Sequence, residues 1–144
     1  MAIEISAEHQ ANLKTLVVES VDNWNAKATQ EQKAAGEALM QRFKDEPEFG
    51  ATYVARMKTN FEAADANQDG QLDRQEYMVF QEKQCDHARQ DGTFVEPTPN
   101  YIERCYELFQ QIAGGEGITF EQYLAITGKF MAIFKEMNDA AESA

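Results

Sequence analysis

The sequence predicts an all-α fold of six helices, and three observations support this prediction. Apolar residues recur mostly at steps of three and four along the chain, as they do on the buried face of a helix. No stretch shows the apolar–polar alternation of a half-buried strand. Proline, glycine and capping residues divide the chain into segments of helical length.

The first three segments precede residue 65. The first helix is expected from Ser6, as its N-cap, to about Trp24. The second begins near Thr29, where Gln32 provides the spacing of a capping box, and it stops before residues 45–47. The third helix ends at residue 65 and carries a buried stripe at four-residue steps, formed by Phe49, Tyr53, Met57 and Phe61.

The other three helices follow residue 76. The fourth is expected to end near Gly92, and residues 91–99, with one Gly and two Pro, are the most evident linker. The pair Thr98-Pro99 predicts the start of the fifth helix, with Pro99 at the first helical position. The sixth helix is expected from Thr119 to about Met137.

Residues 65–76 read Asp-Ala-Asn-Gln-Asp-Gly-Gln-Leu-Asp-Arg-Gln-Glu, and this segment predicts a calcium loop. Calcium takes six to eight oxygen ligands, which twelve residues can provide when alternate early side chains point inward. Gly70 lies where the chain must turn with positive φ. The expected ligands are Asp65, Asn67, Asp69, the backbone carbonyl of Gln71, Asp73 directly or through a water, and both carboxylate oxygens of Glu76. Magnesium is expected to compete at this site, because it binds the same oxygens but prefers six ligands.

From Phe61 to Phe80 the chain resembles the EF-hand superfamily at every position that the loop chemistry specifies. The resemblance implies a second helix–loop–helix unit that pairs with the first through the loop backbones. Residues 111–122 match this partner when Ile118 is aligned with Leu72. Its ligand positions hold no carboxylate, so this loop is expected to pair without binding calcium; they are Gln111, Ala113, Gly115, Gly117, Thr119 and Gln122.

The resemblance therefore predicts two parts of the chain. Residues 48–144 would form an EF-hand pair of four helices, with an intact loop at 65–76 and a degenerate loop at 111–122. Residues 1–47 would form a two-helix amino-terminal extension. Whether that extension is itself a degenerate hand is left open, because its acidic and amide residues lack the turn glycine and the closing glutamate.

Charge and targeting features narrow the function further. Twenty-five acidic and thirteen basic residues give a net charge of −12, which disfavours nucleic acid and attracts cations and basic segments. The chain lacks an apolar run of spanning length, a secretory signal and lipidation motifs, so we expect no membrane anchor and a cytoplasmic location. Cys85 and Cys105 are then expected to be free thiols.

Several functions are compatible with a single calcium loop. The main expectation is a calcium sensor that engages a protein partner, such as a basic or amphipathic helix; a calcium buffer and a structural subunit stabilised by calcium are the alternatives. Two arrangements are open for the apolar sixth helix. Either one face packs on the hand pair and the other on the first two helices, with Trp24 buried between, or part of the helix forms, with Met57 and Met78, a partner surface that calcium exposes. The sequence assigns neither the partner nor the oligomeric state.

An enzyme is not expected. His9 and His87 lie outside any recognised catalytic motif, and neighbouring residues such as Cys85 and His87 face different directions on a helix. The glycine run at 114–117 lacks the Lys-Ser/Thr pair of a phosphate-binding loop.

Overall fold

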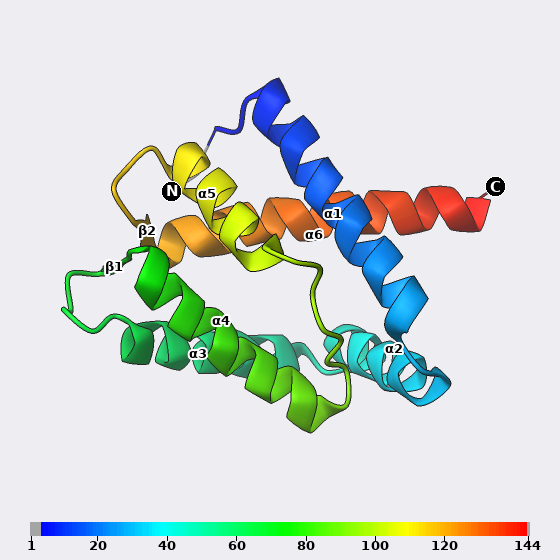
Figure 1. Cartoon of the computed structure of the whole chain (residues 1–144). Coiled ribbons are helices and arrows are strands. Elements are labelled where there is room, and N and C mark those ends of the chain that lie inside the picture. The colour runs from blue at the N-terminus through cyan, green and yellow to red at the C-terminus, as the bar shows by residue number, and fades with distance from the viewer. Residues whose placement is uncertain (1–3, 144) are drawn as a thin grey trace.

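The computed structural model describes residues 4–143, which form six helices and one short antiparallel sheet (Figure 1). The helices are α1 (Ala7–Lys27), α2 (Gln30–Asp45), α3 (Pro47–Ala64), α4 (Arg74–Asp91), α5 (Tyr101–Ala113) and α6 (Phe120–Ser143). The strands are β1 (Gln71–Leu72) and β2 (Ile118–Thr119). The predicted all-α class is confirmed, because each strand contains only two residues.

Local capping signals determine several of the helix ends. The hydroxyl of Ser6 accepts a hydrogen bond from the His9 amide at 3.1 Å and so begins α1. Thr29 and Gln32 form a reciprocal capping box at the start of α2. Gly92 ends α4 in the left-handed conformation with a φ of 77°. These boundaries agree with the sequence-based predictions.

Two helix boundaries differ from the predictions. The expected start of α5 at Pro99 is wrong, because Asn100 takes a φ of 62° and helical geometry begins only at Tyr101. The Tyr101 amide closes the preceding turn by donating to the Thr98 carbonyl at 3.1 Å. The helix α6 continues past Met137 to Ser143, since residues 138–143 contain no Pro or Gly that would end it.

Among the described residues, five of the six helices, α1 and α3 to α6, share one buried core, and α2 contributes no residue to it. The pairs α3–α4 and α5–α6 are joined by the β1–β2 sheet, and α1 crosses α6 and lies against α5 (Figure 1). Leu13, Leu16 and Val17 of α1 are buried in the same cluster as Phe80 of α4 and Ile126 of α6. The predicted boundary after residue 47 falls at the first residue of α3, but α1 packs as part of the common core.

Polar contacts fix α1 on α5. The Tyr101 hydroxyl donates a hydrogen bond to the Leu16 carbonyl at 3.0 Å. The guanidinium of Arg104 forms an ion pair with Glu19 at 3.0 Å. The prediction that α6 packs on the first two helices is confirmed for α1 only, because α2 makes few contacts with α6 and Trp24 is half-buried against α2.

The helix α2 packs chiefly on α3. The ring of Phe43 lies 4.8 Å from that of Phe49 and 5.3 Å from that of Tyr53, measured between centroids. Trp24 is half-buried at the α1–α2 junction, where its ring lies 3.5 Å from the position that a Cβ on Gly36 would take. The two helices are separated only by residues 28 and 29, which is too short for a twelve-residue ligand loop between them.

The residues of the proposed partner surface differ in exposure. Met57 is only 8% exposed and belongs to the core, because it lies on the face of α3 that turns inward with Phe61, as the predicted buried stripe indicates. Met78 is half-buried, whereas Met131 on α6 is 45% exposed. The exposure of this surface by calcium stays a prediction. Cys85 and Cys105 are free thiols, as predicted.

Candidate metal centre

The candidate site lies in the connection between α3 and α4. Asp65 ends α3, and Asp73 is the N-cap of α4. Gly70 has a φ of 82°, a conformation in which a Cβ is strained, and this explains the glycine at the turn. The whole connection is short and begins and ends at capped helix termini, so its side chains are held from both ends.

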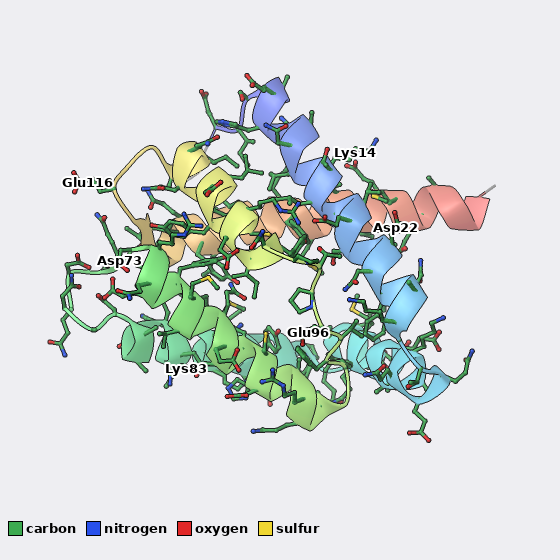
Figure 2. The ribbon with its side chains drawn as sticks, in the orientation of Figure 1. Lys14, Asp22, Asp73, Lys83, Glu96 and Glu116 are labelled. Carbon is green, nitrogen blue, oxygen red and sulfur yellow. The ribbon has the colours of Figure 1, made fainter. Side chains whose placement is uncertain are left out.

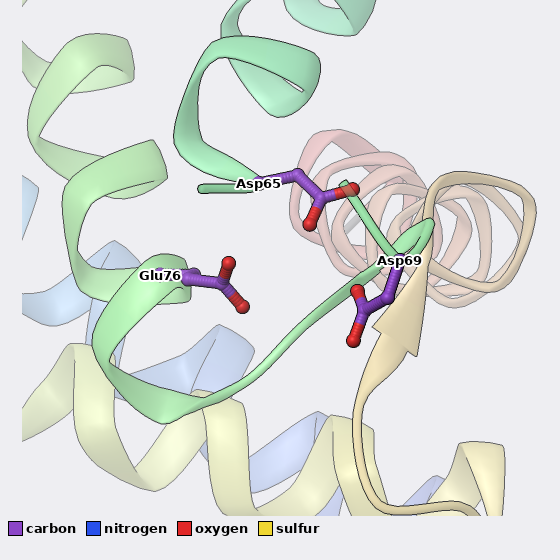
Figure 3. A group of neighbouring side chains, drawn as sticks. All are labelled: Asp65, Asp69 and Glu76. Carbon is purple, nitrogen blue, oxygen red and sulfur yellow. The ribbon is translucent and has the colours of Figure 1, made fainter. Parts of the chain in front are cut away.

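Three of the six predicted ligands gather in this loop (Figure 3). One carboxylate oxygen each from Asp65, Asp69 and Glu76 lies within 4.8 Å of the others. Asp65 and Glu76 are each only 8% exposed, whereas Asp69 is exposed. Two buried carboxylates and one exposed carboxylate therefore face one another across the loop.

Backbone amides hold the two buried carboxylates. Asp65 Oδ2 accepts from the Gly70 amide at 2.8 Å, and Glu76 Oε2 accepts from the Ala66 amide at 2.8 Å. Glu76 Oε1 accepts from the Asp73 amide at 3.1 Å. Asp65 Oδ1 is buried and has no hydrogen-bond partner in the part of the chain that the structure describes. A buried carboxylate oxygen without a hydrogen-bond partner favours a cation at the site.

The other three predicted ligands are exposed and have structural roles as well. Asn67 Oδ1 accepts from the Asp69 amide at 3.3 Å, which shapes the turn. Asp73 Oδ1 accepts from the Glu76 amide at 2.8 Å, which completes the capping box of α4. Gln71 begins β1. The structure does not bring Asp73 into the carboxylate cluster, and it does not contradict the backbone role predicted for Gln71.

In the part of the chain that the structure describes, no basic side chain forms an ion pair with the cluster of Asp65, Asp69 and Glu76. The nearest basic residue in sequence, Arg74, pairs instead with Glu107 of α5 at 3.3 Å. Carboxylates this close repel one another by about 1 kcal/mol per pair in bulk water and more where they are buried. A bound cation would remove that repulsion.

A second loop supports the first from α5 and α6. Leu72 pairs with Ile118 and Gln71 with Thr119 in the antiparallel β1–β2 sheet, so the alignment predicted from the sequence is confirmed. Leu72 and Ile118 are both fully buried. Their burial fixes the second half of the carboxylate loop on the core of the protein.

Two contacts at this junction were not foreseen from the sequence. The hydroxyl of Tyr106 on α5 donates to the Leu72 carbonyl at 3.3 Å. A Cβ on Gly117 would lie only 2.9 Å from the same carbonyl oxygen, so this position requires glycine. Both depend on residues far apart in the chain, and no local sequence pattern identifies them.

The second loop offers no comparable donor set. In the described residues, the only group of three or more acidic, His or Cys side chains placed to share a metal ion is the one in loop 65–76. Figure 2 shows Glu116 at the tip of the second loop, away from Asp73 in the first. The all-oxygen cluster of the first loop suits hard cations such as calcium or magnesium, whereas zinc sites are usually built from Cys and His.

Comparison with known proteins adds no assignment: no protein-family model, curated protein or solved structure matches this chain. None of the helices within residues 4–143 is long and apolar enough to cross a membrane. The functional argument therefore depends on the geometry of the loop itself.

Proposed function

We propose that this chain is an EF-hand calcium-binding protein that binds one calcium ion in loop 65–76. The observation that supports this proposal is the group formed by Asp65, Asp69 and Glu76, whose carboxylates converge within 4.8 Å without a basic partner. The proposal also draws on the twelve-residue pattern of the loop and on its backbone pairing with a second loop.

The residues that would hold the ion are Asp65, Asn67, Asp69, the carbonyl of Gln71, Asp73 and Glu76. The bound ion supplies positive charge to a cluster that otherwise has none. Asp65 and Glu76 come from the adjoining ends of α3 and α4, so ligation ties the two helices together. Magnesium is expected to occupy the same oxygens when calcium is low.

Titration calorimetry tests this assignment. Wild-type protein should bind one calcium ion per chain, and Glu76→Gln should lose high-affinity binding because it removes the closing carboxylate. The matched control is Glu116→Gln, which removes the same charge from the second loop and should leave affinity and stoichiometry unchanged. Two ions per chain, or wild-type affinity in the Glu76 variant, would contradict the proposed ligand set.

We propose further that the protein is a calcium sensor and not a calcium buffer. The helix α4 carries Glu76 in its first turn and Phe80 in the common core, so a shift of α4 on ligation would reach the core directly. The net charge of −12 favours a basic or amphipathic helical segment as the protein partner. Exposed Met131 and Val18 offer adaptable apolar contacts for such a segment on α6 and α1.

Amide hydrogen exchange separates this sensor role from its alternatives. A sensor should show calcium-dependent changes in exchange within α1 or α6, far from the loop. A buffer should change only residues near loop 65–76. A structural subunit stabilised by calcium should bind its partner equally well after chelation. Changes confined to the loop would therefore refute the sensor role while leaving calcium binding intact.

A further inference from the structure

A cavity of about 300 Å³ lies beside the second half of α4, away from the metal loop at the start of that helix. Its walls come from α1, α4, the beginning of α5 and the linker between α4 and α5. Trp24 lies on the α1 side, Cys85 and Ala88 on the α4 side, and Phe94 and Thr98 on the linker side. This volume is at the lower end of the range of sites that bind small molecules.

The linker wall is fixed by hydrogen bonds to two helices. Asn23 Nδ2 and Lys27 Nζ on α1 donate to the Glu96 carbonyl at 2.9 and 3.1 Å. Gln32 Nε2 on α2 donates to the Phe94 carbonyl at 2.7 Å. Figure 2 shows Glu96 on the linker as it passes between α1 and α4. The cavity is therefore bounded by a tethered segment and not by a loose loop.

The cavity continues toward the core. A second cavity of about 240 Å³ shares Ser20, Gln81, Tyr101 and Ile102 with the first and extends to α6. The shared residues form a common wall, so the two cavities are adjacent.

The lining of both cavities is uncharged, although the chain has a net charge of −12. A charged ligand placed there would lose its hydration without gaining an opposite charge, which is unfavourable. Aromatic rings from Trp24, Phe94 and Tyr101 line the first cavity and favour flat apolar groups. The uncharged lining therefore favours a neutral ligand.

Two hydroxyl groups in these uncharged cavities are unused. Thr98 lines the first cavity and Thr127 the second, and the hydroxyl oxygen of each is buried without a hydrogen-bond partner among the described residues. Buried hydroxyls are usually hydrogen-bonded, so an unpartnered one beside a cavity is suited to a ligand. We propose that the first cavity is a binding site for a neutral, largely apolar small molecule with an aromatic ring and one hydrogen-bonding group. The proposal is independent of the metal loop.

A matched pair of fluorescent probes tests the proposal on the full chain. N-phenylnaphthylamine is neutral, with two aromatic groups and one N–H donor, and anilinonaphthalene sulfonate adds a negative charge to the same skeleton. Trp24 is the only tryptophan of the chain and lines this cavity, so energy transfer from it reports a bound probe, and variants of the lining then locate that probe. The neutral probe should bind saturably at one site, and the sulfonate at least about tenfold more weakly.

Two variants link that binding to the cavity. Ala88→Leu fills the space from α4 and should abolish energy transfer, whereas Ala63→Leu, at an exposed position on α3 away from the cavity, should bind as wild type does. Thr98→Val keeps the side-chain shape but removes the acceptor for the probe's N–H. It should weaken binding by about two- to tenfold without lowering the thermal midpoint, since the lost hydroxyl had no partner.

Thiol labelling locates the probe independently. Cys85 lines the first cavity and is half-buried, so a bound neutral probe should slow its alkylation by a neutral maleimide, as measured by peptide mass spectrometry. Four outcomes would overturn the proposal: no binding of the neutral probe, equal binding of the sulfonate, wild-type binding by the Ala88 variant, or unchanged labelling of Cys85.

Discussion

Replacing Asp69 with Asn tests whether the carboxylate cluster is built for a cation or for the loop fold. Asp69 is the exposed member of the cluster, and its Oδ1 accepts a hydrogen bond from the Gln71 amide at 2.9 Å. Asn has the same shape and can accept the same hydrogen bond through its own Oδ1. The substitution therefore removes one negative charge and preserves the turn.

The substitution should stabilise the ion-free protein and weaken its affinity for calcium. In the ion-free protein, Asp69 lies within 4.8 Å of the carboxylates of Asp65 and Glu76. Each pair repels by about 1 kcal/mol in water at this distance, and screening of the exposed Asp69 leaves a total of about 1–2 kcal/mol. Relief of this repulsion should raise the ion-free thermal midpoint by roughly 4 °C for a chain of this size.

Calcium binding should weaken in the same variant. A charge about 2.4 Å from a divalent ion contributes about 3 kcal/mol at the dielectric constant of water. The repulsion among the carboxylates acts with and without the ion and cancels in the binding free energy, so the loss is about 3 kcal/mol, which corresponds to roughly a 150-fold weaker affinity. Calorimetry gives the affinity, and thermal unfolding in chelator gives the stability.

The control is Glu37→Gln, which removes one charge from an exposed position on α2. This substitution should change neither the free energy of unfolding of the ion-free protein nor the free energy of calcium binding by more than about 0.5 kcal/mol. A lower ion-free midpoint in the Asp69 variant, together with unchanged calcium affinity, would refute the argument. Asp69 would then be a turn residue whose charge stabilises the fold.

Three further predictions follow from other contacts. Gly117→Ala places a Cβ 2.9 Å from the Leu72 carbonyl oxygen, so it should lower the free energy of urea unfolding by about 1–3 kcal/mol and weaken calcium binding. The control Gly115→Ala, whose Cβ would lie 3.7 Å from its nearest neighbour, should have neither effect. Equal effects of the two substitutions would rule out the close approach as the cause. Burial raises the pKa of Tyr77 and Tyr123 above 10.0, so as the pH rises these hydroxyls lose their protons in the unfolded chain before they do so in the folded one. The free energy of unfolding should therefore fall as the pH rises above about 10. A constant urea midpoint up to about pH 11.5 would count against this prediction. Millimolar magnesium should lower the apparent calcium affinity in calorimetry, because both ions use the same oxygens, and an unchanged affinity would exclude competition.

The sequence alone determined the features that depend on residues close together in the chain. The helix caps at Ser6 and Thr29 and the end of α4 at Gly92 were predicted, since each depends on hydrogen bonds or backbone angles within one turn. The loop pattern likewise predicted that Asp65 and Glu76 would face each other, because a twelve-residue turn between two helices brings its ends together.

Long-range packing decided the rest. The start of α5 moved to Tyr101, whose side chain reaches the Leu16 carbonyl across the core. The cavity beside Trp24 exists because α1, α4 and the linker meet there. Such features depend on which surfaces meet in the folded chain, and apolar periodicity shows only that a face is buried, not what covers it.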